Sequence, residues 1–284
     1  MRVLTVPNWS FGRDRALLGR VQDHLVTLGL HVHFCESDVD HNRTVTAFSG
    51  PGPLVFEALL DLGRMILPSI DLNRHSGVHP RIGGLDVCPF VALDGDEKDL
   101  VRDVERFAEL LAMRFDVPVY LYEKSEIGRH EADLPALRKG GFGSLLERDL
   151  NPDFGPSRAH PQIGATVMGV RSWLIALNVN LKGHDSSVAK QIAREIRHLR
   201  ETGDVRFLGV RALGLPLVSQ NLTQVSINLT LPDITPIDPI LEWVDHRARD
   251  LGLAVKENEL IGVIRPRDLE HATRLPFKPE QVVA

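Results

Sequence analysis

The chain has 284 residues, a length that fits about two domains of ordinary size. Its 33 Lys and Arg against 38 Asp and Glu leave a formal net charge of −5, which excludes polybasic nucleic-acid binders as a class. Aromatic residues make up only 6% of the chain, which argues against a surface that stacks single-stranded bases. The 43% of apolar residues suffice for a packed core, so we expect a globular protein.

The two cysteines, Cys35 and Cys88, lie far apart and belong to no CxxC pair, so neither a disulfide framework nor a cysteine zinc site is predicted. The first residues are broken by Pro7 too early to form a signal peptide. The uncharged stretch 212–232 carries eight Ser, Thr, Asn and Gln residues and is interpreted as strand, because each would be costly in a membrane. We expect a cytoplasmic protein.

Apolar residues recur three or four positions apart in five stretches, and this spacing predicts five amphipathic helices. The helices are expected at residues 17–28, 55–66, 100–111, 186–200 and 237–251. Thr235 is predicted to cap the last helix, with Pro236 in its first turn.

Short β-branched or alternating runs between the helices predict ten strands. These are residues 2–6, 30–36, 43–49, 87–93, 117–122, 165–170, 173–181, 206–213, 217–230 and 253–257. The second half therefore has the order β-α-β-β-α-β, and the first half is a decorated version of it. We expect an α+β fold of two ferredoxin-like βαββαβ subdomains, residues 1–172 and 173–284, packed with a cleft between them.

Two segments, 71–86 and 123–164, are rich in Gly and Pro and predict long irregular loops, with at most two short helices in the second. Long loops in compact domains are usually functional or linkers, and these two lack the bland polar composition of a linker. No phosphate-binding loop, GxGxxG or GxSxG motif is present, which disfavours nucleotide folds and the α/β-hydrolases.

His75 and His79 lie four residues apart in the first loop. Gly77 and Pro80 interrupt the helix that a zinc site of this spacing requires, so no metal site is predicted. An imidazole with a pKa near neutrality can instead act as a general base, and Pro80 would restrict the backbone beside it. The alternative is that both histidines only bond to the backbone of the loop.

Residues 151–164 could wrap a flat ligand. Gly155 and Gly164 would permit close backbone approach, while Ser157, His160 and Gln162 offer hydrogen bonds. The residue types alone equally fit a surface loop. Arg43 and Arg171 are candidates for binding a carboxylate.

Several motifs together resemble the glutamate formimidoyltransferase family. The resemblance rests on Val6-Pro7-Asn8-Trp9-Ser10, Asn42-Arg43-Thr44-Val45, the HxGxHPRxGxLDxCPF run of residues 75–90, Val117-Pro118-Val119-Tyr120-Leu121-Tyr122, Pro152-Asp153-Phe154-Gly155-Pro156-Ser157, and Gly164-Ala165-Thr166-Val167. The motifs occur in the order of the family and cover nearly the whole chain.

The resemblance implies transfer of a formimino group from N-formimino-L-glutamate to N5 of tetrahydrofolate, a co-substrate, in histidine degradation. It implies two ferredoxin-like subdomains, a homodimer, and His79 as the catalytic residue. The implied folate-binding segment is Gly155, Pro156, Ser157, Arg158, Ala159, His160, Pro161, Gln162, Ile163 and Gly164. Asn8, Asn42, Arg43, Arg81 and Asp86 are further candidates for binding substrates, with Asp86 or a backbone carbonyl orienting His79. No nucleic-acid or membrane partner is expected.

The chain departs from the family pattern at three positions. Phe11 and Val78 stand where the family has Glu, and Ile163 where it has Trp. Two alternatives therefore stay open beside formimino transfer, namely a folate-dependent formyltransferase that uses N-formyl-glutamate, and a folate-binding module without catalysis.

Overall fold

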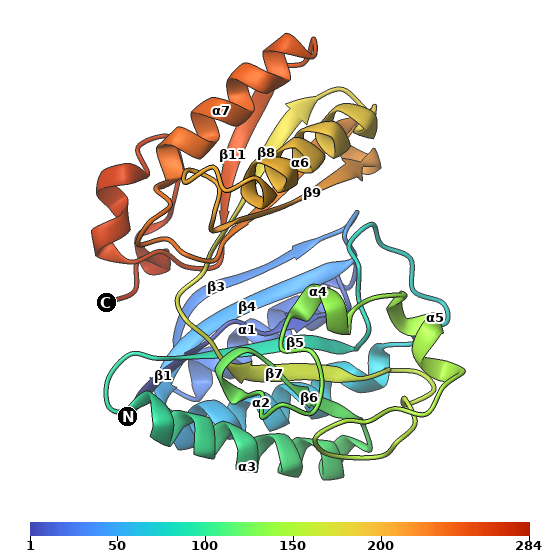
Figure 1. Ribbon diagram of the computed structural model, residues 1–284. Helices are drawn as coiled ribbons and strands as arrows, with labels where there is room; N and C mark the ends of the chain where they lie inside the picture. The colour runs from blue at the N-terminus through green and yellow to red at the C-terminus, as the bar shows by residue number, and fades with distance from the viewer. The chain divides into compact units, whose positions relative to one another are not determined.

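A computed structural model describes residues 1–284. The chain divides into two compact units, Met1–Arg171 and Ser172–Ala284, each with its own sheet (Figure 1). Both units combine helices with a sheet, which confirms the predicted α+β class.

Seven strands form the sheet of the first unit. Its elements in chain order are β1 (Arg2–Thr5), β2 (Asn8–Trp9), α1 (Arg15–Thr27), β3 (His31–Asp38), β4 (Arg43–Pro51), α2 (Gly52–Ile66), η1 (Leu67–Ser69), β5 (Leu85–Ala92), α3 (Glu97–Phe115), β6 (Val119–Leu121), η2 (Glu123–Ser125), α4 (Leu134–Leu137), α5 (Gly141–Leu146) and β7 (Thr166–Val170). β3, β4, β1 and β5 pair antiparallel in that spatial order, which is the predicted βαββαβ arrangement. β7 and β6 extend the sheet by parallel pairing beyond β5.

The two faces of this sheet are covered differently. α1, α2 and α3 bury their apolar faces in one core, in which Trp9, Phe48 and Phe90 are fully enclosed. The segment between β6 and β7 covers the opposite face and forms a smaller core with Tyr120, Tyr122 and other residues. As predicted, this segment contains only two short α-helices, α4 and α5.

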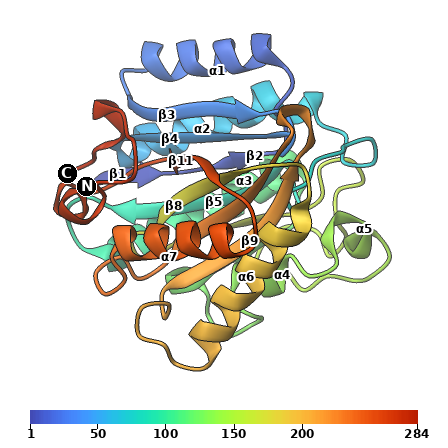
Figure 2. The same cartoon turned by 90° about the horizontal axis from the view of Figure 1, so that it is seen from above.

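The second unit contains a four-stranded antiparallel sheet in the order β11-β8-β10-β9. Its elements are β8 (Ile175–Lys182), α6 (Ser186–Glu201), β9 (Val210–Leu217), η3 (Val218–Gln220), β10 (Leu222–Leu229), α7 (Ile237–Asp250), β11 (Val255–Ile261), η4 (Pro266–His271) and η5 (Pro279–Gln281). α6 and α7 lie side by side and share one core with the sheet (Figure 2). The order matches the predicted ferredoxin-like topology.

Two predicted strands of the second unit are displaced. The strand expected at 206–213 begins only at Val210, because Arg206 and Phe207 lie in a turn closed by bonds to Asp204. The strand expected at 217–230 begins at Leu222, after a hairpin turn in which Asn221 has a φ of 55°. An apolar run that continues through a turn conceals the turn from pattern analysis.

Side-chain capping marks the starts of three of the long helices. The side chains of Asp14, Asp96 and Asp185 accept backbone N–H groups at the starts of α1, α3 and α6. The predicted cap of α7 is wrong: Pro236 occupies the N-cap, and the buried hydroxyl of Thr235 has no hydrogen-bond partner.

Candidate active site

The predicted histidine run lies in the irregular loop between η1 and β5. The Val78 N–H donates to the carbonyl of Asp40 over 3.0 Å, and the Leu72 N–H donates to the carbonyl of Gln162 over 2.8 Å. The loop is therefore fastened both to the turn before β4 and to the segment before β7.

His79 is half-buried and its ring contacts three groups. Nδ1 lies 2.9 Å from the carbonyl oxygen of Pro80, and Nη1 of Arg43 lies 2.7 Å from Nδ1 and 2.8 Å from Nε2. The ring of His41 packs against it at a centroid distance of 5.7 Å. Because a carbonyl only accepts, the contact with Pro80 assigns the proton to Nδ1. Nε2 is then the ring nitrogen that can accept a hydrogen bond from Arg43.

The electrostatic surroundings of His79 favour its neutral form. Burial and the positive charges of Arg43 and Arg138 hold the pKa of His79 well below its ordinary value of 6.5. The imidazole is thus unprotonated at neutral pH, as a general base must be. The near-neutral pKa expected from the sequence is wrong for the unliganded chain, because burial and two cations disfavour the imidazolium.

Arg81 holds the loop rather than facing solvent. Its guanidinium donates to the carbonyls of His41, Asn42 (2.8 Å) and His79 (3.1 Å). It also donates to Nε2 of His75 over 2.9 Å. Four backbone and side-chain groups in two segments are fixed by this one side chain, so Arg81 positions the residues around His79.

His75 differs from His79 in its contacts. Its Nε2 lies 3.0 Å from the carbonyl of Asn42 as well as close to Arg81. Burial and the charge of Arg81 lower the pKa of His75 to about 4. These contacts join the loop to its own Arg81 and to the turn before β4, which favours a structural role for His75.

Asp86 bonds to partners other than His79. Its buried carboxylate accepts the Ile82 N–H over 2.8 Å through Oδ1 and a guanidinium N–H of Arg138 through Oδ2. Of the two predicted groups that could orient His79, the carbonyl of Pro80 is therefore the one that contacts the ring.

Asn42 joins three segments around the site. It has a φ of 45°, a conformation that Asn tolerates better than most residues. Its side chain accepts the Gly12 N–H over 2.8 Å and donates to the carbonyl of Ser76 over 3.1 Å. Arg13 donates to the same carbonyl and to the Ser76 hydroxyl, each over 3.1 Å.

The segment 155–164 lies beside the loop, near Ile82 and Gly84. The Gly84 N–H donates to the carbonyl of Ile163 over 2.8 Å, and the Ala165 N–H donates to that of Ile82 over 3.0 Å. Ala159, Ile163 and Gly164 are buried and anchor the segment, whereas Gly155, Ser157, Arg158, Pro161 and Gln162 are exposed, with Pro156 and His160 between these extremes.

The two glycines of this segment permit close approach to the chain itself. A Cβ at Gly155 would lie 2.4 Å from the carbonyl oxygen of Val117, and one at Gly164 would lie 2.0 Å from that of Ile82. His160 is likewise used locally, since its Nδ1 accepts the N–H groups of Gln162 and Ile163, each over 3.2 Å.

Three other candidate residues have partners away from His79. The Asn8 side chain donates to the carbonyl of Val6 over 2.9 Å. Arg158 forms an exposed ion pair with Asp149 at 3.0 Å. Arg171 is close to Tyr122, whose side chain bonds to it.

Phe11 and Val78, which stand where the family has Glu, add no charge to the site. Phe11 belongs to the core of the first unit, with 6% of its surface exposed, and its carbonyl accepts the Thr44 hydroxyl proton. Val78 is half-buried in the loop.

Pattern analysis missed Arg138 and His41. Arg138 follows α4 and meets Asp86 from 52 residues away, in a segment whose composition only indicated a loop. His41 lies directly before the Asn42-Arg43 motif, and this adjacency was the available signal.

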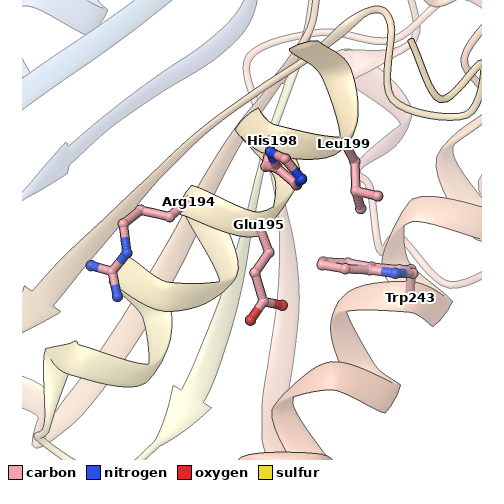
Figure 3. Close-up of a pocket in the computed structure, with 5 residues that line it drawn as sticks. All are labelled: Arg194, Glu195, His198, Leu199 and Trp243. Atoms are coloured by element: carbon pink, nitrogen blue, oxygen red, sulfur yellow. The ribbon is translucent and has the colours of Figure 1, made fainter. Parts of the chain in front are cut away.

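A hollow of about 440 Å³ lies on the second unit, between α6 and α7 (Figure 3). It is lined by Arg194, Glu195, His198, Leu199 and Trp243. The negative charge of Glu195 is neutralised by two hydrogen bonds from Arg247, of 2.6 and 2.8 Å.

No set of three His, Cys, Asp or Glu side chains in residues 1–284 is grouped so that it could hold a metal ion. None of the helices combines the length and apolar character needed to span a membrane.

Comparison with known proteins identifies both units. Residues 2–171 match the family model described as "Formiminotransferase domain, N-terminal subdomain", and residues 176–282 match "Formiminotransferase domain". The division between the matches coincides with the division between the compact units.

Full-length relatives are of two kinds. The chain is 37% identical over 270 residues to formimidoyltransferase-cyclodeaminase of Sus scrofa, covering 91% of this chain and 49% of the relative. It is 33% identical over 264 residues to glutamate formimidoyltransferase of Streptococcus pyogenes, covering 91% and 87%. The same-named protein of Thermoplasma acidophilum is 33% identical over 267 residues, covering 91% and 86%. The chain thus spans about half the length of the bifunctional relatives it matches.

Proposed function

Because this chain belongs to the formiminotransferase family, we propose that it transfers the formimino group of N-formimino-L-glutamate to N5 of tetrahydrofolate, in histidine degradation. The observation that carries the proposal is the contact of His79 Nδ1 with the carbonyl of Pro80 at 2.9 Å, in surroundings that lower the pKa of the imidazole. Nε2 is then the basic atom of the site.

In the proposed mechanism, Nε2 of His79 takes the proton that N5 loses as the bond from N5 to the formimino carbon forms. The resulting imidazolium returns this proton to the glutamate nitrogen as the bond between that nitrogen and the formimino carbon breaks. His79 ends neutral, and one bond has formed for each that has broken. Pro80 keeps the tautomer throughout, because its carbonyl can only accept a hydrogen bond.

Tetrahydrofolate supplies the nucleophilic N5, and the segment 155–164 fits it. The exposed side chains of Ser157, Arg158 and Gln162 offer hydrogen bonds to a folate. Arg158, which pairs with the exposed Asp149 in the unliganded chain, would bind the anionic glutamate tail in place of that carboxylate. Their anchors, Ala159 and Ile163, keep the segment beside Gly84, close to the loop that carries His79.

The test is a steady-state assay with tetrahydrofolate and either N-formimino-L-glutamate or N-formyl-L-glutamate. The proposal expects turnover of the formimino donor and a much lower kcat/KM with the formyl donor. A preference for the formyl donor would make the chain a formyltransferase, and folate binding without turnover of either donor would make it a binding module.

We also propose that the chain is cytoplasmic and acts as a homodimer, as the resemblance to the family implies. Light scattering of the purified protein measures the mass in solution, and a mass near 31.6 kDa would contradict the dimer.

A further inference from the structure

Positive charge is in excess around His79. The guanidinium groups of Arg43, Arg81 and Arg138 interact with one another there, and Asp86 is the carboxylate that acts on them. Asp38, which faces Arg43 across β3 and β4, instead accepts the His41 N–H over 2.6 Å. Burying cations without enough counter-charge is costly, so the arrangement fits an anionic ligand.

Two buried hydrogen-bond donors in this cluster have no acceptor. They are the Nε–H groups of Arg43 and Arg138. Arg43 makes hydrogen bonds only to His79, and Arg138 only to Asp86, so each guanidinium has N–H groups without an acceptor. Arg81 is different, because its guanidinium N–H groups already donate to backbone carbonyls and to His75. Guanidinium groups bind carboxylates with paired, charge-assisted hydrogen bonds, and this identifies the class of anion.

The position of Arg43 also bears on the base. Its Nη1 lies 2.8 Å from Nε2 of His79, the atom that must receive a proton. A carboxylate is a stronger acceptor for a guanidinium than a neutral imidazole is. An anion bound at Arg43 therefore competes directly with His79 for the same donor.

We propose that Arg43 and Arg138 bind a carboxylate of the amino-acid donor, and that this carboxylate draws Arg43 off His79 and frees Nε2. Binding of the formimino donor and activation of His79 as the base then occur together. The inference rests on the proposed function, since it names the subsite for the glutamate part of the donor. Arg43 and Arg138 act in it as binding and positioning residues, and His79 remains the base.

The experiment uses the full chain with L-glutamate as the probe, followed by calorimetry and by NMR titration of the His79 imidazole nitrogens. In the wild type, L-glutamate should raise the pKa of His79, because it neutralises an adjacent cation. In Arg43→Gln the pKa of His79 should already be raised and should respond less to L-glutamate, because the cation that contacts the ring is gone. Arg43→Gln and Arg138→Gln should each weaken L-glutamate binding by about tenfold or more.

Two further variants and a folding control complete the test. Arg43→Lys keeps the charge and should retain part of the binding. Arg102→Gln, on an exposed face of α3, should bind L-glutamate as the wild type does. A melting temperature for each variant shows that it is folded.

Three results would each overturn the inference. They are wild-type affinity for L-glutamate in both Arg→Gln variants, no measurable binding of L-glutamate to the wild type up to its solubility limit, and a pKa of His79 that does not change when L-glutamate is added. Turnover of the formimino donor together with any of these results would leave the proposed function standing. Arginine-dependent binding of L-glutamate without turnover would leave the subsite and remove the reaction.

Discussion

Arg81 donates to the imidazole of His75 over 2.9 Å and to the carbonyl of His79 over 3.1 Å, so one guanidinium holds both histidines of the loop through different atoms. It engages the ring of His75 but only the backbone of His79. The imidazole of His79 is thereby left to interact with Arg43. This difference separates a loop-forming histidine from one that can do chemistry.

His79→Ala should lower kcat by about 10²–10⁴-fold, the usual contribution of a general base, while the fold persists. His75→Ala should lower kcat much less and should mainly lower the melting temperature, because it removes a hydrogen-bond acceptor of Arg81. Steady-state kinetics and thermal unfolding of both variants check this. Equal losses of kcat, or a fully active His79→Ala, would reverse the assigned roles.

The free energy of unfolding should fall as the pH is lowered from about 6.5 to 4. The pKa of His75 is about 4 in the folded chain and ordinarily 6.5, so within this window the unfolded state binds a proton that the folded state rejects. For this group the slope is at most about 1.4 kcal/mol per pH unit.

Denaturant titrations across that window measure this dependence. His75→Gln should flatten it, leaving a weaker dependence that comes from His79, whose pKa is also lowered. His246→Gln, on an exposed position of α7, should keep the wild-type dependence. If the His75 variant is as sensitive to acid as the wild type, the burial of His75 beside Arg81 does not control the acid dependence of stability.

Gly77→Ala should destabilise the first unit and lower kcat. A Cβ at this position would lie 2.2 Å from the carbonyl oxygen of His41 and 2.7 Å from Nη2 of Arg81, so the loop must move away from β4. Overpacking of this kind costs about 1–3 kcal/mol. Gly19→Ala is the matched control, because nothing lies within 4 Å of its Cβ and it sits in α1. That variant should be neutral or more stable, by up to about 1 kcal/mol. A Gly77→Ala protein as stable and active as the Gly19 variant would refute this packing account.

Tetrahydrofolate should raise the melting temperature of the wild type, because it binds only the folded chain. Replacing the exposed Ser157, Arg158 and Gln162 together by Ala should abolish this shift and leave the unliganded melting temperature nearly unchanged. Gly155 and Gly164 are left intact, since a side chain at either would clash with the backbone. A triple variant that still responds to tetrahydrofolate would place its binding site elsewhere.

Local patterns sufficed for most of the architecture. Apolar spacing predicted the five long helices, because a helix that buries one face must repeat its apolar residues every three or four positions. It failed at Asn221, where apolar residues flank a hairpin turn on both sides. The capping preference of Thr failed at Thr235, whose hydroxyl is buried instead of capping α7.

The sequence by itself determined the family, the two βαββαβ units and the chemical candidates, because these depend on residue types and on spacing along the chain. Only the tertiary structure decided which atoms meet at His79. Arg138 reaches Asp86 across 52 residues, and Arg43 reaches His79 across 36. Such contacts depend on how the sheet and its long insertion pack, and no local period encodes them. The same packing sets the charge around the imidazole, and therefore its protonation state.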